Sequence, residues 1–389
     1  MVGVKDLASS GYRVILILGV VSLLGDFIYE GGRSIIPDYM RQLGMDALLV
    51  GASLGLAEFA GWAARPLGGL MADKTGKYAS VIRAGYGGLF VIPLMAFAPG
   101  WWFVVALAFA ERVFRGVRIP ARDALLARLR GKIGLGTAFG LHEFMDQVGA
   151  TAGPLLAVAI LALYNSTSTV FLYMFIPYLL LLVSLIFIPG YSEPPLRLKQ
   201  IKPSKKILIY SGAAGLNSAG LLPLPLLLYM VSVEAGYGSW LVPAAYAVAM
   251  VVDAVAGLAL GRAFDKWGGA VVALAVILSV SPAVFVNAPL TLLMFCSLLL
   301  GVVIGAQESV FRAMVAHLAG KEGLGSSYAL YGLALGVGSA VAGVAYGYMI
   351  EAGIALHLII LYAVTVEAAA LTLISYILKQ EQQLSPPHH

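Results

Sequence analysis

Long apolar runs, separated by short groups of charged, glycine, proline and asparagine residues, follow one another along the whole chain. Most runs reach the roughly 20 residues that an α-helix needs to cross a bilayer, and they lack the alternation of polar and apolar positions typical of β-barrel strands. The pattern predicts an all-α membrane protein with twelve transmembrane helices. Their expected ranges are 13–42, 46–71, 79–98, 101–128, 135–163, 168–188, 206–231, 239–262, 269–287, 289–318, 324–350 and 354–378.

Composition narrows the class of protein further. Of 389 residues, 60% are hydrophobic and 12% are charged, and the mean hydropathy is +0.90. A soluble fold has too little interior for so much apolar side chain, so the composition excludes a soluble enzyme, a nucleic-acid binder and a disordered protein. The single cysteine, Cys296, excludes a disulfide framework and any site with several cysteine ligands.

Lysine and arginine residues gather in every second loop. The loops near residues 74–77, 128–132, 197–206, 262–266 and 321 are basic, whereas the alternate loops carry Arg41 and almost no other basic residue. Because basic loops remain in the cytoplasm, the sequence predicts a multi-pass protein of the cytoplasmic membrane with both termini on the cytoplasmic side.

The chain contains an internal repeat. The segment Gly131–Gly136 recurs with one substitution at Gly320–Gly325, an offset of 189 residues, and the same offset pairs Gly149 with Gly338. Parallel repeats of six helices are a transporter architecture, with the substrate site between the halves. We therefore predict an N-terminal six-helix bundle at 1–189, a cytoplasmic linker at 190–206 and a C-terminal six-helix bundle at 207–389.

Two loop segments carry related copies of one motif. The first reads Gly69-Leu-Met-Ala-Asp73-Lys74-Thr-Gly76-Lys77 and lies between the second and third expected helices. A weaker copy, Gly261-Arg-Ala-Phe-Asp265-Lys266-Trp-Gly268, lies between the eighth and ninth. The motif resembles the signature of the major facilitator superfamily. The resemblance covers essentially the whole chain and implies two pseudo-symmetric bundles, alternating access and a monomer that uses no cofactor.

Two helical segments extend the resemblance. Arg112-Val-Phe-Arg115-Gly116 is similar to a motif of the family's fourth helix, and Gly149-Ala-Thr-Ala-Gly153-Pro154 is similar to the core of a motif typical of its antiporters. In the fifth helix we expect both glycines to permit close helix packing and Pro154 to remove one backbone hydrogen bond.

The resemblance assigns a gating role to the loop motifs. Their glycines allow a tight turn, and Asp73 is expected to face the N-terminus of helix 324–350 and the basic end of the fourth helix, near Arg122. A carboxylate at a helix N-terminus gains about 0.3–1 kcal/mol, which is enough to bias two conformations without locking one. Asp265 and Arg312 are expected to form the pseudo-symmetric copy of this contact in the C-terminal half.

Polar and ionisable residues at membrane depth are the candidate coupling and substrate groups, because they are costly there. For some of them a structural role is the alternative: Glu111 and Arg115, four residues apart, are a candidate buried bridge, and Arg118 is expected to reach water from near a helix end. The candidates are Asp26, Glu30, Arg33, Glu58, Glu111, Arg112, Arg115, His142, Glu143, Asp146, Asn217, Asp253, Gln307, Glu308 and Tyr331.

Acidic groups beside an arginine are expected to take up and release the coupling proton. The leading hypothesis is a secondary active transporter for proton-coupled export of a small organic solute, driven by a proton or sodium gradient. The expected pairs are Glu143 or Asp146 with Arg112, and Asp26 or Glu30 with Arg33.

Two alternatives remain open from the sequence. Carboxylate and imidazole ligands suit Mn, Fe or Zn, so His142 and Asp146 are the candidate ligands of a divalent metal transporter with the same fold. A membrane enzyme is the alternative from another class, but no HExxH or GxSxG pattern stands in a suitable place. The expected partners are the solute and the lipid bilayer, with no nucleic acid and no nucleotide.

Overall fold

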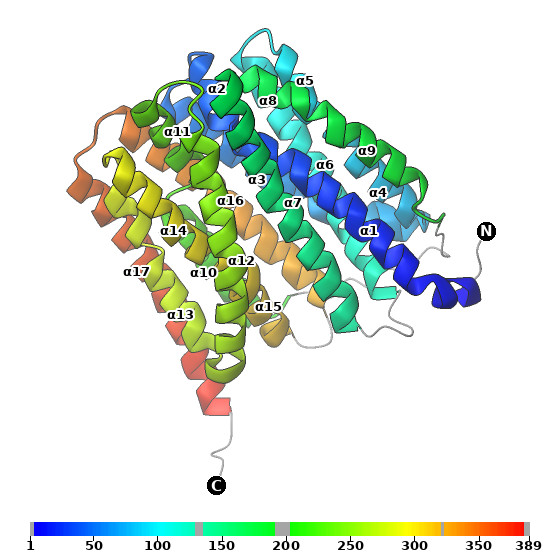
Figure 1. Cartoon of the computed structure of the whole chain (residues 1–389). Coiled ribbons are helices and arrows are strands. Elements are labelled where there is room, and N and C mark those ends of the chain that lie inside the picture. Colours follow the sequence, from blue (N-terminus) through cyan, green and yellow to red (C-terminus); the bar gives the residue numbers. More distant parts are fainter. Residues whose placement is uncertain (1–3, 129–134, 191–202, 320–322, 385–389) are drawn as a thin grey trace. The chain divides into compact units, whose positions relative to one another are not determined.

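The computed structural model describes residues 4–128, 135–190, 203–319 and 323–384, and within these ranges it contains helices and no strand (Figure 1). Three internal segments lie outside the described residues: the basic segment 129–134, the linker segment 191–202 and residues 320–322. The repeated segments 131–136 and 320–325 are therefore described only in part. The α-helices are α1 (Val4–Arg33), α2 (Ile36–Gln42), α3 (Ala47–Thr75), α4 (Tyr78–Gly87), α5 (Val91–Leu94), α6 (Trp101–Arg128), α7 (Leu135–Tyr164), α8 (Thr167–Tyr173), α9 (Phe175–Ile186), α10 (Lys205–Gly220), α11 (Leu224–Ala235), α12 (Leu241–Trp267), α13 (Gly269–Leu278), α14 (Leu290–Ala306), α15 (Arg312–Ala319), α16 (Leu324–Glu351) and α17 (Leu356–Leu384). Shorter segments are η1 (Gly88–Phe90), η2 (Met95–Phe97), η3 (Ser281–Phe285) and the π-helical η4 (Gln307–Phe311).

Ten of the helical segments in the described part of the chain are long and apolar enough to cross a membrane. The all-α membrane fold expected from the apolar runs is thus confirmed. Two expected spans fall outside these ten. The ninth, Gly269–Phe285, is shorter, and the fourth, α6, carries several charged residues in its middle.

Several apolar runs that look continuous in sequence are interrupted helices. The run 206–231 divides into α10, which ends at Gly220, and α11, which begins at Leu224. Pro223 lies in the break, and proline cannot donate the backbone hydrogen bond that would continue a helix. The run 13–42 divides in the same way between α1 and α2, where Pro37 stands in the first turn of α2.

The chain separates into two compact units. Unit 1 comprises residues 1–45, 60–198 and 235–247, and unit 2 comprises residues 46–59, 199–234 and 248–389. Two long helices, α3 and α12, therefore contribute one part to each unit. The bundle boundaries expected at residues 189 and 207 stay predictions.

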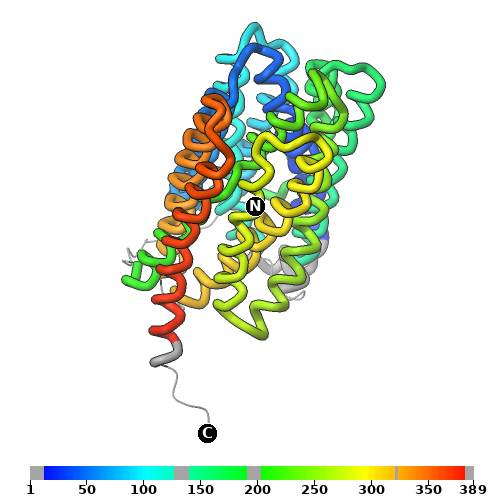
Figure 2. Tube along the Cα trace, turned by 90° about the vertical axis from the view of Figure 1, so that its left-hand side faces the viewer, coloured from blue at the N-terminus to red at the C-terminus, as the bar shows by residue number. Residues whose placement is uncertain are grey.

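Close packing of α1 against α7 within unit 1 depends on glycine (Figure 1). A Cβ atom at Gly149 would collide with the backbone oxygen of Leu23, and one at Gly153 would collide with that of Phe27. In unit 2, α10 packs against α16 and α17, the last of which is red in Figure 2. There a Cβ atom at Gly338 would collide with the backbone oxygen of Gly215. The predicted packing role of Gly149 and Gly153 is confirmed, and the repeat partner Gly338 has the same role.

The π-helical segment η4 lies between α14 and α15 and is bordered by tyrosine hydroxyl groups. Tyr331 donates to the backbone oxygen of Gln307 (3.5 Å), Tyr210 to that of Phe311 (3.0 Å) and Tyr328 to that of Arg312 (3.0 Å). A π-turn disturbs the regular hydrogen bonding of a helix and is common at functional sites. Here the side chains of α10 and α16 supply hydrogen bonds to the carbonyl groups at this turn.

Candidate functional site

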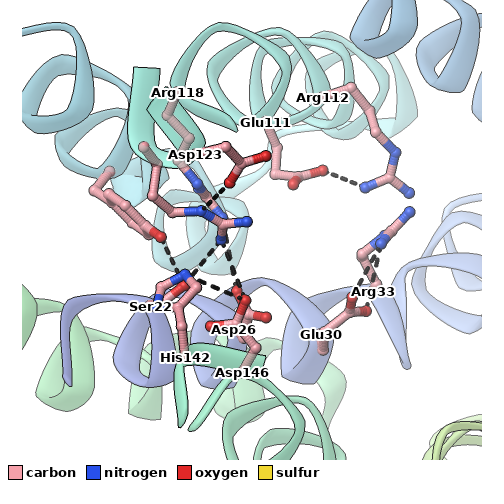
Figure 3. Close-up of polar contacts among 12 residues, drawn as sticks. Ser22, Asp26, Glu30, Arg33, Glu111, Arg112, Arg118, Asp123, His142 and Asp146 are labelled. Atoms are coloured by element: carbon pink, nitrogen blue, oxygen red, sulfur yellow. Dashed lines mark hydrogen bonds and ion pairs between the residues drawn. The ribbon is translucent and has the colours of Figure 1, made fainter. Parts of the chain in front are cut away.

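Polar side chains of unit 1 converge from three helices, α1, α6 and α7 (Figure 3). Glu111, Arg115, Arg118 and Arg122 on α6 are spaced by four, three and four residues, which places them along one face of the helix. On α1, Ser22, Asp26 and Glu30 are spaced by four residues and also share a face. We call this set, together with Arg33, Arg112, Asp123, His142 and Asp146, the polar cluster.

One end of the polar cluster is centred on Arg122. Its Nη1 atom lies 3.2 Å from Asp146 Oδ2 and 3.1 Å from Ser22 Oγ, and its Nε atom lies 3.1 Å from Asp123 Oδ1. The sequence led us to expect Arg122 near Asp73. Arg122 instead contacts α1 and α7, whereas Asp73 accepts a hydrogen bond from Tyr78 at 2.6 Å, and the expected proximity of Asp73 and Arg122 stays a prediction.

Arg118 is the largest fully buried side chain of the described residues, with 1% of its surface exposed. Its Nη2 atom lies 3.8 Å from Asp26 Oδ1, and its guanidinium group lies 4.1 Å from the ring centroid of Tyr86 and 5.3 Å from that of Tyr29. The expectation that Arg118 reaches water is therefore wrong. Its spacing from Glu111 and Arg122 on one helix face was the signal that pointed to the cluster.

The other end of the polar cluster contains Glu30 and Glu111. Arg33 Nη1 lies 3.2 Å from Glu30 Oε1, which agrees with the expected pair, and the hydroxyl group of Tyr246 also donates to Glu30. Glu111 forms an ion pair with Arg112, its neighbour in sequence. The Arg115 guanidinium lies over the Tyr29 ring, 4.8 Å from its centroid, and the predicted Glu111–Arg115 bridge stays a prediction.

Charges in the polar cluster balance. Its carboxyl groups belong to Asp26, Glu30, Glu111, Asp123 and Asp146, and its guanidinium groups belong to Arg33, Arg112, Arg115, Arg118 and Arg122. Buried charges of one sign would be very costly in a membrane protein, whereas paired charges offset much of that cost. A neutral cluster can nevertheless change its net charge when one carboxyl group gains a proton.

Two neighbouring candidates on α7, His142 and Glu143, lie in different surroundings. His142 is buried and its Nε2 atom lies 3.7 Å from Asp146 Oδ2, so it joins the polar cluster. Glu143, the next residue, is exposed and accepts a hydrogen bond from Gln147 at 3.4 Å. Asp146 pairs with Arg122 from the next turns of α6, and the expected pairing of Glu143 or Asp146 with Arg112 stays a prediction.

The loop motifs form tight turns, as expected. Gly76 has a φ of +66° and Gly268 a φ of +57°, values that favour glycine. Lys74, Lys77 and Lys266 are exposed. The expected pair of Asp265 and Arg312 is not formed: both are exposed, and the described part of unit 2 holds no ion pair between them.

Unit 2 holds a second, smaller group of polar side chains. Asn217 donates to Ser279 Oγ and to Glu367 Oε2, each at 2.9 Å, and accepts from Gln307 Nε2 at 2.9 Å. Asn217 and Gln307 were expected site residues, but Glu367 was missed. It is the only charged residue between Glu351 and Lys379, and this position in a long apolar run was the available signal.

Of the remaining candidates of unit 2, Tyr331 contacts this group through its hydrogen bond to the backbone oxygen of Gln307. Asp253 is buried where α12 approaches Gly305. Tyr331 is buried and stacks on Tyr210 with ring centroids 6.3 Å apart. Glu58 is half-buried on the part of α3 that belongs to unit 2, and Glu308 is exposed.

In the described part of the chain, no three His, Cys, Asp or Glu side chains are placed to hold one metal ion. His142 and Asp146 are two ligands only. We therefore expect manganese or zinc chloride to leave the melting temperature of the purified protein unchanged, because a ligand raises stability only by binding the folded state. A metal-dependent increase that His142→Ala abolishes would contradict this prediction.

Comparison with known proteins supplies the family. Residues 15–343 match the family model described as Major Facilitator Superfamily. An uncharacterized protein of Mycobacterium tuberculosis is 30% identical over 383 residues, which cover 94% of each chain. The multi-drug resistance efflux pump PmrA of Streptococcus pneumoniae is 24% identical over 195 residues, 48% of each chain. A crystal structure of a mutant of the nucleoside transporter NupG matches with a TM-score of 0.74 at 13% identity, covering 94% of this chain and 99% of the other.

Proposed function

Because the chain belongs to the major facilitator superfamily and is a multi-pass membrane transporter, we propose that it exports a small organic solute in exchange for protons. We place it in the cytoplasmic membrane with both termini inside, on the basis of the basic residues of alternate loops, and we expect a monomer, as the family resemblance implies. The proton gradient supplies the driving force, so the transport cycle requires no cofactor and no nucleotide.

The observation that carries this proposal is the pair of acids at one end of the polar cluster. Asp26 and Asp146 come from α1 and α7, lie close enough to interact electrostatically, and face the guanidinium groups of Arg118 and Arg122 (Figure 3). Two carboxylates that share one site repel each other, so a proton on either of them relieves the repulsion. Such an arrangement suits a group that binds and releases a proton in each cycle.

Proton binding would also change the contacts between helices. A proton on Asp146 weakens its ion pair with Arg122, whose guanidinium group then keeps Ser22 and Asp123 as partners. The contact that joins α6 to α7 is thereby weakened, while the contacts of Arg122 on α6 and α1 remain. Because a ligand shifts a conformational equilibrium only through different contacts in the two states, the loss of the α6–α7 contact is the step that we assign to coupling.

Two observations bear on the direction of transport. The relative PmrA is named as a multi-drug resistance efflux pump, and the segment Gly149–Pro154 resembles the core of an antiporter motif. Both favour export over import.

We expect Asp146→Asn to abolish solute movement driven by a pH gradient while the protein still folds, because the asparagine cannot bind and release a proton. A thermal-shift screen of nucleosides, peptides and lipophilic organic cations selects the solute, and its movement is then measured in proteoliposomes with an imposed pH gradient. Glu143→Gln is the matched control, since Glu143 lies three residues earlier on α7 but is exposed. The control should retain gradient-driven transport.

Unchanged gradient-driven transport in Asp146→Asn would overturn the assignment of coupling to this acid. Loss of transport in both variants would do the same, because it would show that removing any carboxylate from α7 has the effect. Melting temperatures of both variants close to that of the wild type establish that the comparison concerns folded protein.

A further inference from the structure

Glu367 is an acidic residue buried in unit 2, far along the chain from the polar cluster. It lies in the middle of α17, where 2% of its surface is exposed. The carboxyl group sits against the end of α10, since a Cβ atom on Gly220 would lie 2.8 Å from Glu367 Oε1. A larger residue at this position would therefore displace the carboxyl group.

No cation neutralises this carboxyl group within the described residues. Oε2 accepts a hydrogen bond from Asn217 Nδ2 at 2.9 Å, whereas Oε1 has no hydrogen-bond partner there. The other titratable groups that face it are neutral tyrosines, Tyr346 from α16 and Tyr362 from α17 itself. The elements packed around Glu367 therefore supply hydroxyl and amide groups but no lysine, arginine or histidine ion pair.

The adjacent helix end makes a negative charge still less favourable. α10 ends at Gly220, and the C-terminal end of a helix carries partial negative charge on its free carbonyl groups. Tyr346 donates to the backbone oxygen of Gly220 at 2.5 Å, and Tyr362 donates to that of Ala219 at 3.0 Å. These hydroxyl groups are thus used by the helix end and do not compensate the carboxyl group.

From this environment we propose that Glu367 is a proton-binding site of unit 2, separate from the polar cluster, and that it retains its proton at neutral pH. An ionised carboxylate buried without a cation is far more costly than the neutral acid. The neutral acid still accepts the hydrogen bond from Asn217. The protonation of Glu367 follows from the geometry alone. A role of Glu367 in coupling rests, in addition, on the proposed antiport.

A chain of hydrogen bonds joins this acid to the π-helical segment. Gln307, the first residue of η4, donates to Asn217 Oδ1 at 2.9 Å, and Asn217 donates in turn to Glu367. When Glu367 loses its proton it becomes a stronger acceptor for Asn217. The state of the acid on α17 is thereby transmitted to η4, where α14 and α15 meet.

Infrared difference spectroscopy tests the site directly, because a protonated carboxylic acid has a carbonyl band that an ionised carboxylate lacks. The full-length protein in lipid nanodiscs is switched between neutral and strongly alkaline buffer. We expect a carbonyl band present at neutral pH in the wild type, absent in Glu367→Gln and unchanged in Glu234→Gln. Glu234 is the matched control because it is exposed at the end of α11.

Asn217→Leu provides a second variant that keeps the acid. It removes the one hydrogen-bond donor to Glu367 found among the described residues, so the carbonyl band should shift in frequency. A band that is identical in the wild type and in Asn217→Leu, or a wild-type spectrum without any band assignable to Glu367, would overturn the proposal.

Sodium provides the remaining arm of the experiment. Replacing potassium chloride by sodium chloride at constant pH should leave the Glu367 band unchanged, whereas its loss in sodium would identify a sodium site and overturn the proton assignment. Failure of the antiport is recognised separately, by unchanged gradient-driven transport in Asp146→Asn. That outcome leaves the infrared result for Glu367 intact, so the two proposals fail independently.

Discussion

Gly149→Ala is expected to lower the melting temperature strongly or to prevent folding, although it adds a single methyl group. The new Cβ atom would collide with the backbone oxygen and the Cα atom of Leu23 on α1. Overpacking of a well-packed interior costs about 1–3 kcal/mol, and the upper end applies here because the obstacle is backbone rather than a movable side chain. α1 and α7 would have to separate, which also moves Asp26 away from Asp146.

Gly140→Ala is the matched control for this prediction. Gly140 belongs to the same helix, but no atom lies within 4 Å of the position that its Cβ would take. Alanine in an open helical position stabilises by about 0.5–1 kcal/mol relative to glycine, so the melting temperature should stay the same or rise. Equal melting temperatures for the two alanine variants, measured by thermal unfolding in detergent, would show that the α1–α7 contact is not limited by Gly149.

Arg118→Met is expected to destabilise unit 1 by about 3–5 kcal/mol, the usual cost of removing one partner of a buried ion pair. Methionine fills much of the arginine volume, so the loss comes mainly from Asp26, which would remain buried without the guanidinium group 3.8 Å away. The stacking of Arg118 on Tyr86 and Tyr29 is lost as well.

The double variant Arg118→Met with Asp26→Asn separates the charge effect from the packing effect. It removes both charges and should recover much of the stability lost in the single variant, because replacing a whole buried ion pair by neutral groups is often close to neutral. Arg262→Met, an exposed position near the end of α12, serves as the control. Absence of any recovery in the double variant would contradict the assigned pairing of Arg118 with Asp26.

Spacing along a helix predicted which residues share the polar face, but not which of them form pairs. Glu111 and Arg115 are correctly placed four residues apart for an intrahelical bridge, yet Tyr29 of α1 lies under Arg115 and Glu111 pairs with Arg112. Likewise Arg118 is close to the end of an apolar run in sequence, and it is buried because Tyr29 and Tyr86 cover it. These contacts depend on side chains from other helices, and the hydropathy of one helix does not predict which side chains those are.

The glycine contacts, the π-helical segment and Glu367 differ in how far the sequence predicts them. The glycine contacts of α7 were predictable because a small-residue pattern has one main use between membrane helices, and the repeat offset extends it from Gly149 to Gly338. The π-helical segment at Gln307–Phe311 was not predictable, because neither proline nor glycine marks it within the segment. Glu367 was open to prediction as the lone charge in a long apolar run.

The charges of α6 have a consequence for how the chain enters the bilayer. An arginine at the centre of an inserting helix costs about 2.5–3.5 kcal/mol, and α6 carries Arg112, Arg115, Arg118 and Arg122. Arg118 pairs with Asp26 on α1, which the ribosome makes earlier, and Arg122 pairs with Asp146 on α7, which it makes later. Stable integration of α6 therefore awaits the synthesis of α7, and a nascent chain that stops before Asp146 would hold α6 only loosely in the membrane.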